Sequence, residues 1–69
     1  MLYFYCVDVY NNSEHRFVNG IFRCDEFDNL ISETLDNAWQ NVQHRMLSKR
    51  NDCTLKILAL NNISGDEKL

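Results

Sequence analysis

Histidines, cysteines and acids are the side chains of this chain that could carry chemistry. His15, His44 and Cys53 form the set that a fold could bring together, with Asp8 and Asp52 as acidic neighbours. Imidazole and thiolate bind zinc, and a Cys-His pair can act as a nucleophile. Their spacing matches no ligand pattern, and surface histidines beside a buried cysteine are the alternative. We therefore assign no metal ligand, cofactor or catalytic residue, and this set stays the one metal candidate.

The three cysteines give no sign of a disulfide framework. Cys6, Cys24 and Cys53 are odd in number, widely spaced and without a Cys-x-x-Cys pair, which also argues against a zinc ribbon. Reduced thiols are typical of the cytosol, so we expect a cytoplasmic protein. Cys6 and Cys24 are interpreted as small apolar core residues.

No catalytic motif is present. The chain has two glycines, no phosphate-binding glycine loop, no Ser-His-Asp order and no close pair of buried carboxylates. We predict that it is not an enzyme. A metal- or thiol-dependent enzyme remains an alternative that rests on the set around Cys53.

The length and net charge of the chain limit the classes of protein to which it can belong. A chain of 69 residues forms one small domain, and its net charge of −3 argues against a sequence-blind nucleic-acid binder. The N-terminus lacks the basic start of a signal peptide, and no apolar run approaches the roughly 20 residues of a membrane helix. We expect neither a nucleic-acid partner nor a membrane.

One helix dominates the pattern. Between Glu26 and Ser48, apolar residues recur at steps of three and four, which predicts an amphipathic helix. Asp25 is the expected N-cap. Leu2–Tyr10, Arg16–Cys24 and Cys53–Leu60 have the composition of strands.

The first two strands are predicted to form a hairpin in which Tyr10 pairs with His15. Asn19-Gly20 is also a turn signal, but a turn there would leave a very short second arm. We therefore place Gly20 within the strand, where Trp39 of the helix approaches the backbone.

The order strand, strand, helix, strand predicts an α+β fold with ββαβ topology. A right-handed crossover through the helix places the last strand beside the first, on the side away from the second, which gives a three-stranded antiparallel sheet in the order 2-1-3. Residues 1–63 form this domain, and residues 64–69 are predicted to be a flexible tail.

Strand alternation then assigns two faces to the sheet. Tyr3, Tyr5, Val7, Val9, Val18, Gly20 and Phe22 share the face under the helix. The opposite face receives the apolar residues Phe4, Cys6, Phe17, Ile21, Leu58 and Leu60. Monomers rarely expose so much apolar surface, so these six residues are the predicted interface of a homodimer.

The order of elements supports a resemblance to known small proteins. The features that carry this resemblance are the aromatic first strand Met1–Val9, then Gly20, the helix and the last strand Leu55–Leu60. In these features the chain resembles short uncharacterised proteins carried by bacteria and their prophages. The resemblance implies no activity. The ββαβ order is also similar to antitoxin-type domains, although the chain has no proline and therefore lacks their usual Pro-Asp after the second strand.

Two functions from different classes follow from these observations. The first is a cytoplasmic interaction or accessory protein, homodimeric, acting by binding another protein. The alternative is a nucleic-acid-associated regulator whose dimer brings together Arg45, Lys49 and Arg50.

Overall fold

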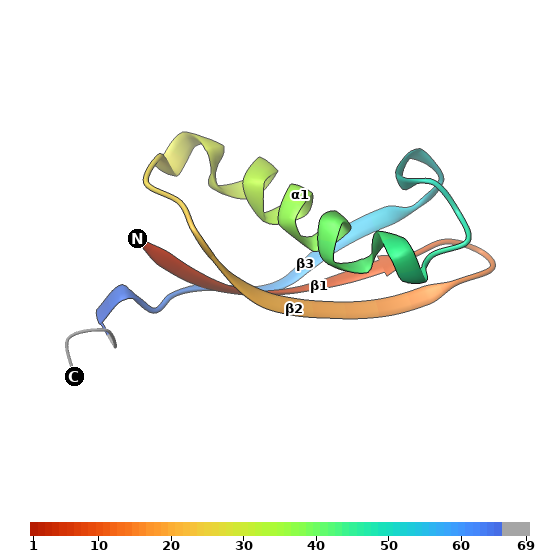
Figure 1. Ribbon diagram of the computed structural model, residues 1–69, viewed down its shortest axis with the longest axis horizontal. Coiled ribbons are helices and arrows are strands. Elements are labelled where there is room, and N and C mark those ends of the chain that lie inside the picture. Colours follow the sequence, from red (N-terminus) through yellow and green to blue (C-terminus); the bar gives the residue numbers. More distant parts are fainter. Residues whose placement is uncertain (66–69) are drawn as a thin grey trace.

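The computed structural model describes residues 1–65. β1 (Leu2–Tyr10), β2 (His15–Arg23) and β3 (Thr54–Asn62) form an antiparallel sheet in the order β2-β1-β3, and α1 (Leu30–Val42) packs on one face (Figure 1). The predicted α+β class, the ββαβ order and the central position of the first strand are confirmed.

The hairpin register is also as predicted. Tyr10 pairs with His15 and the ladder runs without a shift to Leu2 and Arg23. Because side chains alternate along a strand, this register fixes which residues of β1 and β2 meet the helix. The aromatic and β-branched residues at odd positions of β1 are all buried, as expected for the face under α1.

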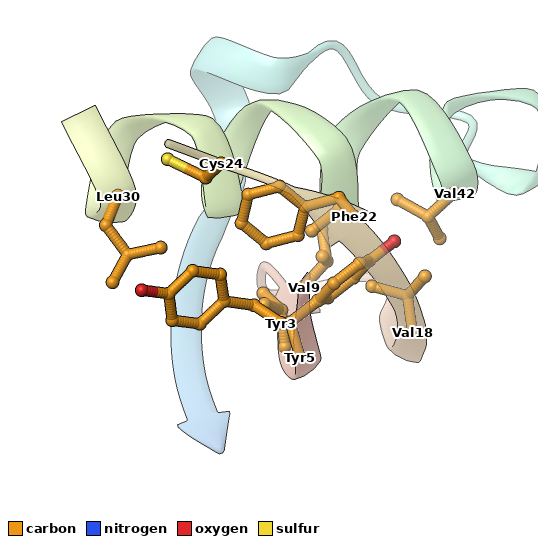
Figure 2. Close-up of a cluster of buried hydrophobic side chains, with 10 residues drawn as sticks. Tyr3, Tyr5, Val9, Val18, Phe22, Cys24, Leu30 and Val42 are labelled. Carbon is orange, nitrogen blue, oxygen red and sulfur yellow. The ribbon is translucent and has the colours of Figure 1, made fainter. Parts of the chain in front are cut away.

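The core lies between this face and one stripe of α1. Leu30, Thr34, Ala38 and Val42 recur at four-residue steps and are the buried residues of the helix. Thr34 satisfies its hydroxyl by donating to the Leu30 carbonyl at 2.7 Å. Figure 2 shows the side chains that fill the space between helix and sheet. The labelled members are Tyr3, Tyr5, Val9, Val18, Phe22, Cys24, Leu30 and Val42.

Gly20 lies within β2, as predicted, but for a different reason. Its cross-strand partner is Tyr5, whose ring lies over it. A Cβ at Gly20 would stand 2.7 Å from the Tyr5 hydroxyl oxygen and 3.0 Å from two ring carbons. The Tyr5 hydroxyl in turn accepts from Asn41 Nδ2 of α1 at 3.0 Å. Tyr5, and not Trp39, is therefore the residue that requires glycine here.

We predict that Gly20→Ala lowers the free energy of unfolding by about 1 to 3 kcal/mol, because the new Cβ would force the buried Tyr5 ring out of its packed position. Urea unfolding followed by circular dichroism measures this change. Gly65→Ala is the matched control, because a Cβ there meets nothing within 4 Å. Equal stability of the two variants would contradict this explanation.

β3 contains an irregularity that changes which side chains share a face. Ala59 pairs with Cys6, whereas Val7 pairs with Ile57, so the ladder shifts between these two pairs and Leu58 is the extra residue. A bulge of this kind reverses the alternation beyond it. Leu60 therefore pairs with Tyr5 and packs against the core, and its predicted place on the opposite face is wrong.

The helix ends earlier than Ser48. α1 stops at Val42, Gln43–Arg45 forms a single 3-10 turn, and Met46 is extended with φ −98° and ψ 139°. The backbone N–H groups of Leu47 and Ser48 bond to the carboxylate of Glu14 at 2.8 and 2.9 Å. These two donors are thus unavailable for continuing the helix.

Hydrogen bonds from the side chains of Glu14 and Asn11 connect the hairpin to the loop after α1. Glu14 also accepts from the Ser48 hydroxyl at 2.6 Å, and Asn11 Nδ2 donates to the Ser48 oxygen at 3.0 Å. The hydrogen bonds from the Leu47 N–H and the Ser48 hydroxyl hold the pKa of Glu14 below its usual value of 4.5. We call this arrangement the Glu14 latch.

The latch predicts a pH-dependent contribution to stability. Because the pKa of Glu14 is lower in the folded state than in the unfolded state, ionised Glu14 stabilises the fold at any pH above its unfolded-state pKa. This stabilisation is lost as the pH falls through the folded-state pKa. Glu14→Gln should therefore be less stable than the wild type at neutral pH, and the difference should shrink below about pH 4. Urea midpoints at both pH values measure this.

Asp28→Asn removes an exposed carboxylate and is the control for the latch. A stability difference between Glu14→Gln and the wild type that stays constant with pH would contradict the assignment.

The start of the helical segment differs from the prediction. A 3-10 turn, Phe27–Asn29, precedes α1, and neither start has a side-chain capping bond. Asp25 instead contacts the amino group of Met1, with 2.6 Å between Oδ1 and the nitrogen, so the expected N-cap is wrong.

The predicted tail begins within the described chain. Ser64 Oγ accepts from the Leu2 N–H at 2.8 Å, so the first residue of that segment is bonded to the sheet. The remainder of the predicted tail, residues 66–69, lies outside the described residues. None of the helices in residues 1–65 has the length and apolar character needed to cross a bilayer.

Candidate functional site

The face of the sheet opposite α1 is the main candidate. No described element lies over it (Figure 1). Phe17 and Ile21 on β2 are 60% and 61% exposed, and Leu58 on β3 is 49% exposed. We call this surface the outer face, with Phe4, Cys6, Phe17, Ile21 and Leu58 as its apolar residues.

Side chains of different size line the outer face. Cys6 lies between its cross-strand partners Asn19 and Ala59. The next position along β1 on the same face, Phe4, pairs with Ile21, so two large side chains stand beside the smaller Cys6 and Ala59. Large side chains that border small ones let two such faces interdigitate.

The hairpin end of the outer face is polar and aromatic. Asp8 is largely covered, with 14% of its side chain exposed, and its Oδ1 lies 2.9 Å from His15 Nε2. That oxygen has no hydrogen-bond donor in bonding geometry within the described chain. His15 also packs between Tyr10 and Phe17, at ring-centroid distances of 5.9 and 4.7 Å.

The three residues of the metal candidate do not share a surface. His15 lies on the outer face with Asp8, whereas Cys53 packs against the core on the helix side and accepts from Asn11 Nδ2 at 3.5 Å. His44 is exposed in the 3-10 turn after α1. Residues 1–65 contain no group of three or more histidine, cysteine or acidic side chains placed to hold a metal ion.

Cys24 is the most enclosed thiol. It is 5% exposed, and its Sγ lies 2.8 Å from Glu33 Oε2 and 3.2 Å from the Glu26 carbonyl. The hydrogen bond to Glu33 and burial raise the pKa of Cys24. Its thiol is thus held in the protonated, unreactive form.

We predict that Cys24 reacts with iodoacetamide more slowly than Cys53 in the native protein, because alkylation requires an exposed thiolate. Peptide mass spectrometry over a time course gives both rates, and the same measurement in urea is the control, where the two rates should converge. Faster modification of Cys24 in the native state would contradict its protonated, enclosed position.

The basic residues after α1 are only partly free. Arg45 and Lys49 are exposed, but Arg50 is paired with Asp36 of α1, with 2.8 Å between Nη1 and Oδ1. The three residues proposed for a nucleic-acid regulator thus do not act as one uncommitted group.

Sequence reasoning did not place three residues on the outer face that the structure places there. Ala59 lies on the outer face because the bulge reverses the alternation of β3. Tyr10 and His15 lie there because they pair with each other at the hairpin end of the β1–β2 ladder. The predicted Tyr10–His15 pair already contained the signal for the last two. Nothing in the alternation of Cys53–Leu60 reveals the bulge.

Comparison with known proteins adds no assignment: no family model, curated protein or solved structure matches this chain.

Proposed function

We propose that this chain is a small interaction protein that forms a homodimer through the outer face and acts by binding another protein. The observation that carries the proposal is the exposure of Phe17, Ile21 and Leu58 on one side of a sheet whose other side is covered by α1. Covering these side chains removes apolar surface from water, which favours association.

A second copy is the partner that we propose for this face. In a two-fold dimer, the same surface patch is present on both partners, so large residues of one copy can pack against small residues of the other. The neighbouring small residues Cys6 and Ala59 and the larger Phe4, Ile21 and Leu58 support this arrangement. Stacked sheets lie roughly 10 Å apart, which leaves room for one interdigitated layer.

Polar residues at the hairpin end border the apolar part of the outer face. Asp8 and His15 lie at one end of it, together with Lys56, the partner of Asp8 on β3. Interfaces commonly have an apolar centre and a polar rim, and charged groups at a rim fix the orientation of the partners. The outer face has this division along β1.

Light scattering across a dilution series at two salt concentrations tests the dimer. We expect twice the monomer mass, with little dependence on salt because the contact is mainly apolar. Phe17→Asp and Leu58→Asp should each give a monomer, since each places a charge in the contact. Both side chains are exposed, but Phe17 pairs with Asp8, so circular dichroism checks that each variant is folded, and Leu58→Asp is the variant without an acidic cross-strand neighbour.

Leu47→Asp is the matched control. Leu47 is 96% exposed in the loop after α1 and lies away from the outer face, so this variant should remain a dimer. A second readout locates the contact: Cys6 should be alkylated faster in Phe17→Asp than in the wild type, with Cys53 as the internal reference. A wild-type monomer at every concentration, or dissociation by Leu47→Asp alone, would overturn the proposal.

A further inference from the structure

The two edge strands of the sheet present different backbone groups. In an antiparallel ladder, alternate residues bond to the neighbouring strand and the others point their N–H and C=O groups outward. Bonds from Cys24 N–H to the Met1 carbonyl and from Asn11 N–H to the Glu14 carbonyl, each 2.9 Å, continue the β1–β2 ladder at its two ends. Odd residues of β2, including Asn19, therefore point outward.

The same reasoning applies to β3. Ile63 N–H donates to the Leu2 carbonyl at 2.9 Å, so even residues of β1 bond to β3. Their partners include Thr54 and Lys56. Leu55 and Ile57, which lie next to these partners, consequently direct their backbone N–H and C=O groups away from the sheet.

Only one of these edges is blocked at its centre. Asn41 of α1 donates through Nδ2 to the outward carbonyl of Asn19 at 3.1 Å, which places a helix side chain on the middle of the β2 edge. Within residues 1–65, no hydrogen bond reaches the outward groups of Leu55 or Ile57. The β3 edge is thus open to a further strand.

Three apolar side chains, Leu55, Ile57 and Trp39, lie on the helix side of the open edge, and we call this strip the ledge. α1 packs over β1 and β2, so the side chains of Leu55 and Ile57 on the helix side of β3 are only half-buried. Trp39 of α1 is also half-buried against the same core. An added strand would place every second side chain over this ledge.

A second copy of β3 fits this edge poorly. If two β3 strands paired along their full length, the bulge at Leu58 would face another bulge in the same ladder. If only the regular halves paired, with Leu55 of one copy opposite Ile57 of the other, the two Lys56 side chains would stand opposite each other with like charge. Lys56 instead favours an acidic partner.

We propose that the first half of the β3 edge, Thr54–Ile57, binds an extended acidic segment of another protein as a fourth antiparallel strand. Side chains of the segment that face the ledge are apolar, and those that face Lys56 are acidic. This extends the proposed function by naming the chemistry of the protein partner, and it does not depend on the homodimer.

A peptide of about six residues in which valine and glutamate alternate is the probe, since this is the length of an ordinary strand. Fluorescence polarisation should show saturable binding. A peptide of the same composition with all valines before all glutamates should bind at least about tenfold more weakly, because it cannot place valines on one face and glutamates on the other.

N-methylation separates strand addition from attraction by charge. Residues that exchange hydrogen bonds across an antiparallel ladder have side chains on the same face, so the valine amides are the ones that meet Leu55 and Ile57. Methylating the valine nitrogens should weaken binding at least about tenfold, whereas methylating the glutamate nitrogens should not. Equal effects of the two methylated peptides would overturn the proposal.

Protein variants locate the site. Lys56→Glu should weaken binding about tenfold or more, whereas Arg23→Glu, the same charge change at the far end of β2, should have little effect. Both side chains are exposed, but Lys56 pairs with Asp8, so circular dichroism checks that Lys56→Glu is folded. Amide resonances of Leu55 and Ile57 should move most on titration, and movement confined to β2 or the outer face would contradict the assignment.

Phe17→Asp distinguishes this inference from the homodimer. That variant should lose the dimer and keep peptide binding. No binding of the alternating peptide at millimolar concentration, to either the wild type or this variant, would overturn the β3 site and leave the dimer standing.

Discussion

One short helix must cover a sheet of three strands, and this constraint determines which surfaces are left for binding. α1 packs over β1 and β2 and holds the Tyr5 hydroxyl and the Asn19 carbonyl through one side chain, Asn41. In this position α1 covers one face of the sheet, and its Asn41 side chain occupies the outward carbonyl of Asn19 on the β2 edge. The outer face and the β3 edge stay open for the same reason, since residues 1–65 contain no second α-helix to cover them.

The features that sequence reasoning recovered depend on short-range patterns. Alternation along β1 and the Tyr10–His15 pair give the hairpin register, and the right-handed crossover gives the strand order. The same alternation identified Phe4, Cys6, Phe17, Ile21 and Leu58 as a group. Apolar periodicity located α1, because a helix that lies on a sheet needs one continuous apolar stripe.

The features that it missed depend on contacts between distant segments. Leu47 and Ser48 continue the helical pattern, but Met46 is extended, and the N–H groups of Leu47 and Ser48 bond to the carboxylate of Glu14, far away along the chain. Gly20 was placed correctly, but its requirement comes from Tyr5 and not from Trp39. Leu60 was misplaced because the extra residue, Leu58, leaves no mark in the composition of the strand.

The central position of β1 also has a consequence for how the chain folds. β1 meets β2 through a short hairpin, but it meets β3 only after the chain has passed through the whole helical segment. Forming the hairpin closes a small loop at low entropic cost, whereas docking β3 closes a much longer one. We therefore expect the hairpin with α1 to form first and β3 to dock in a later, slower step.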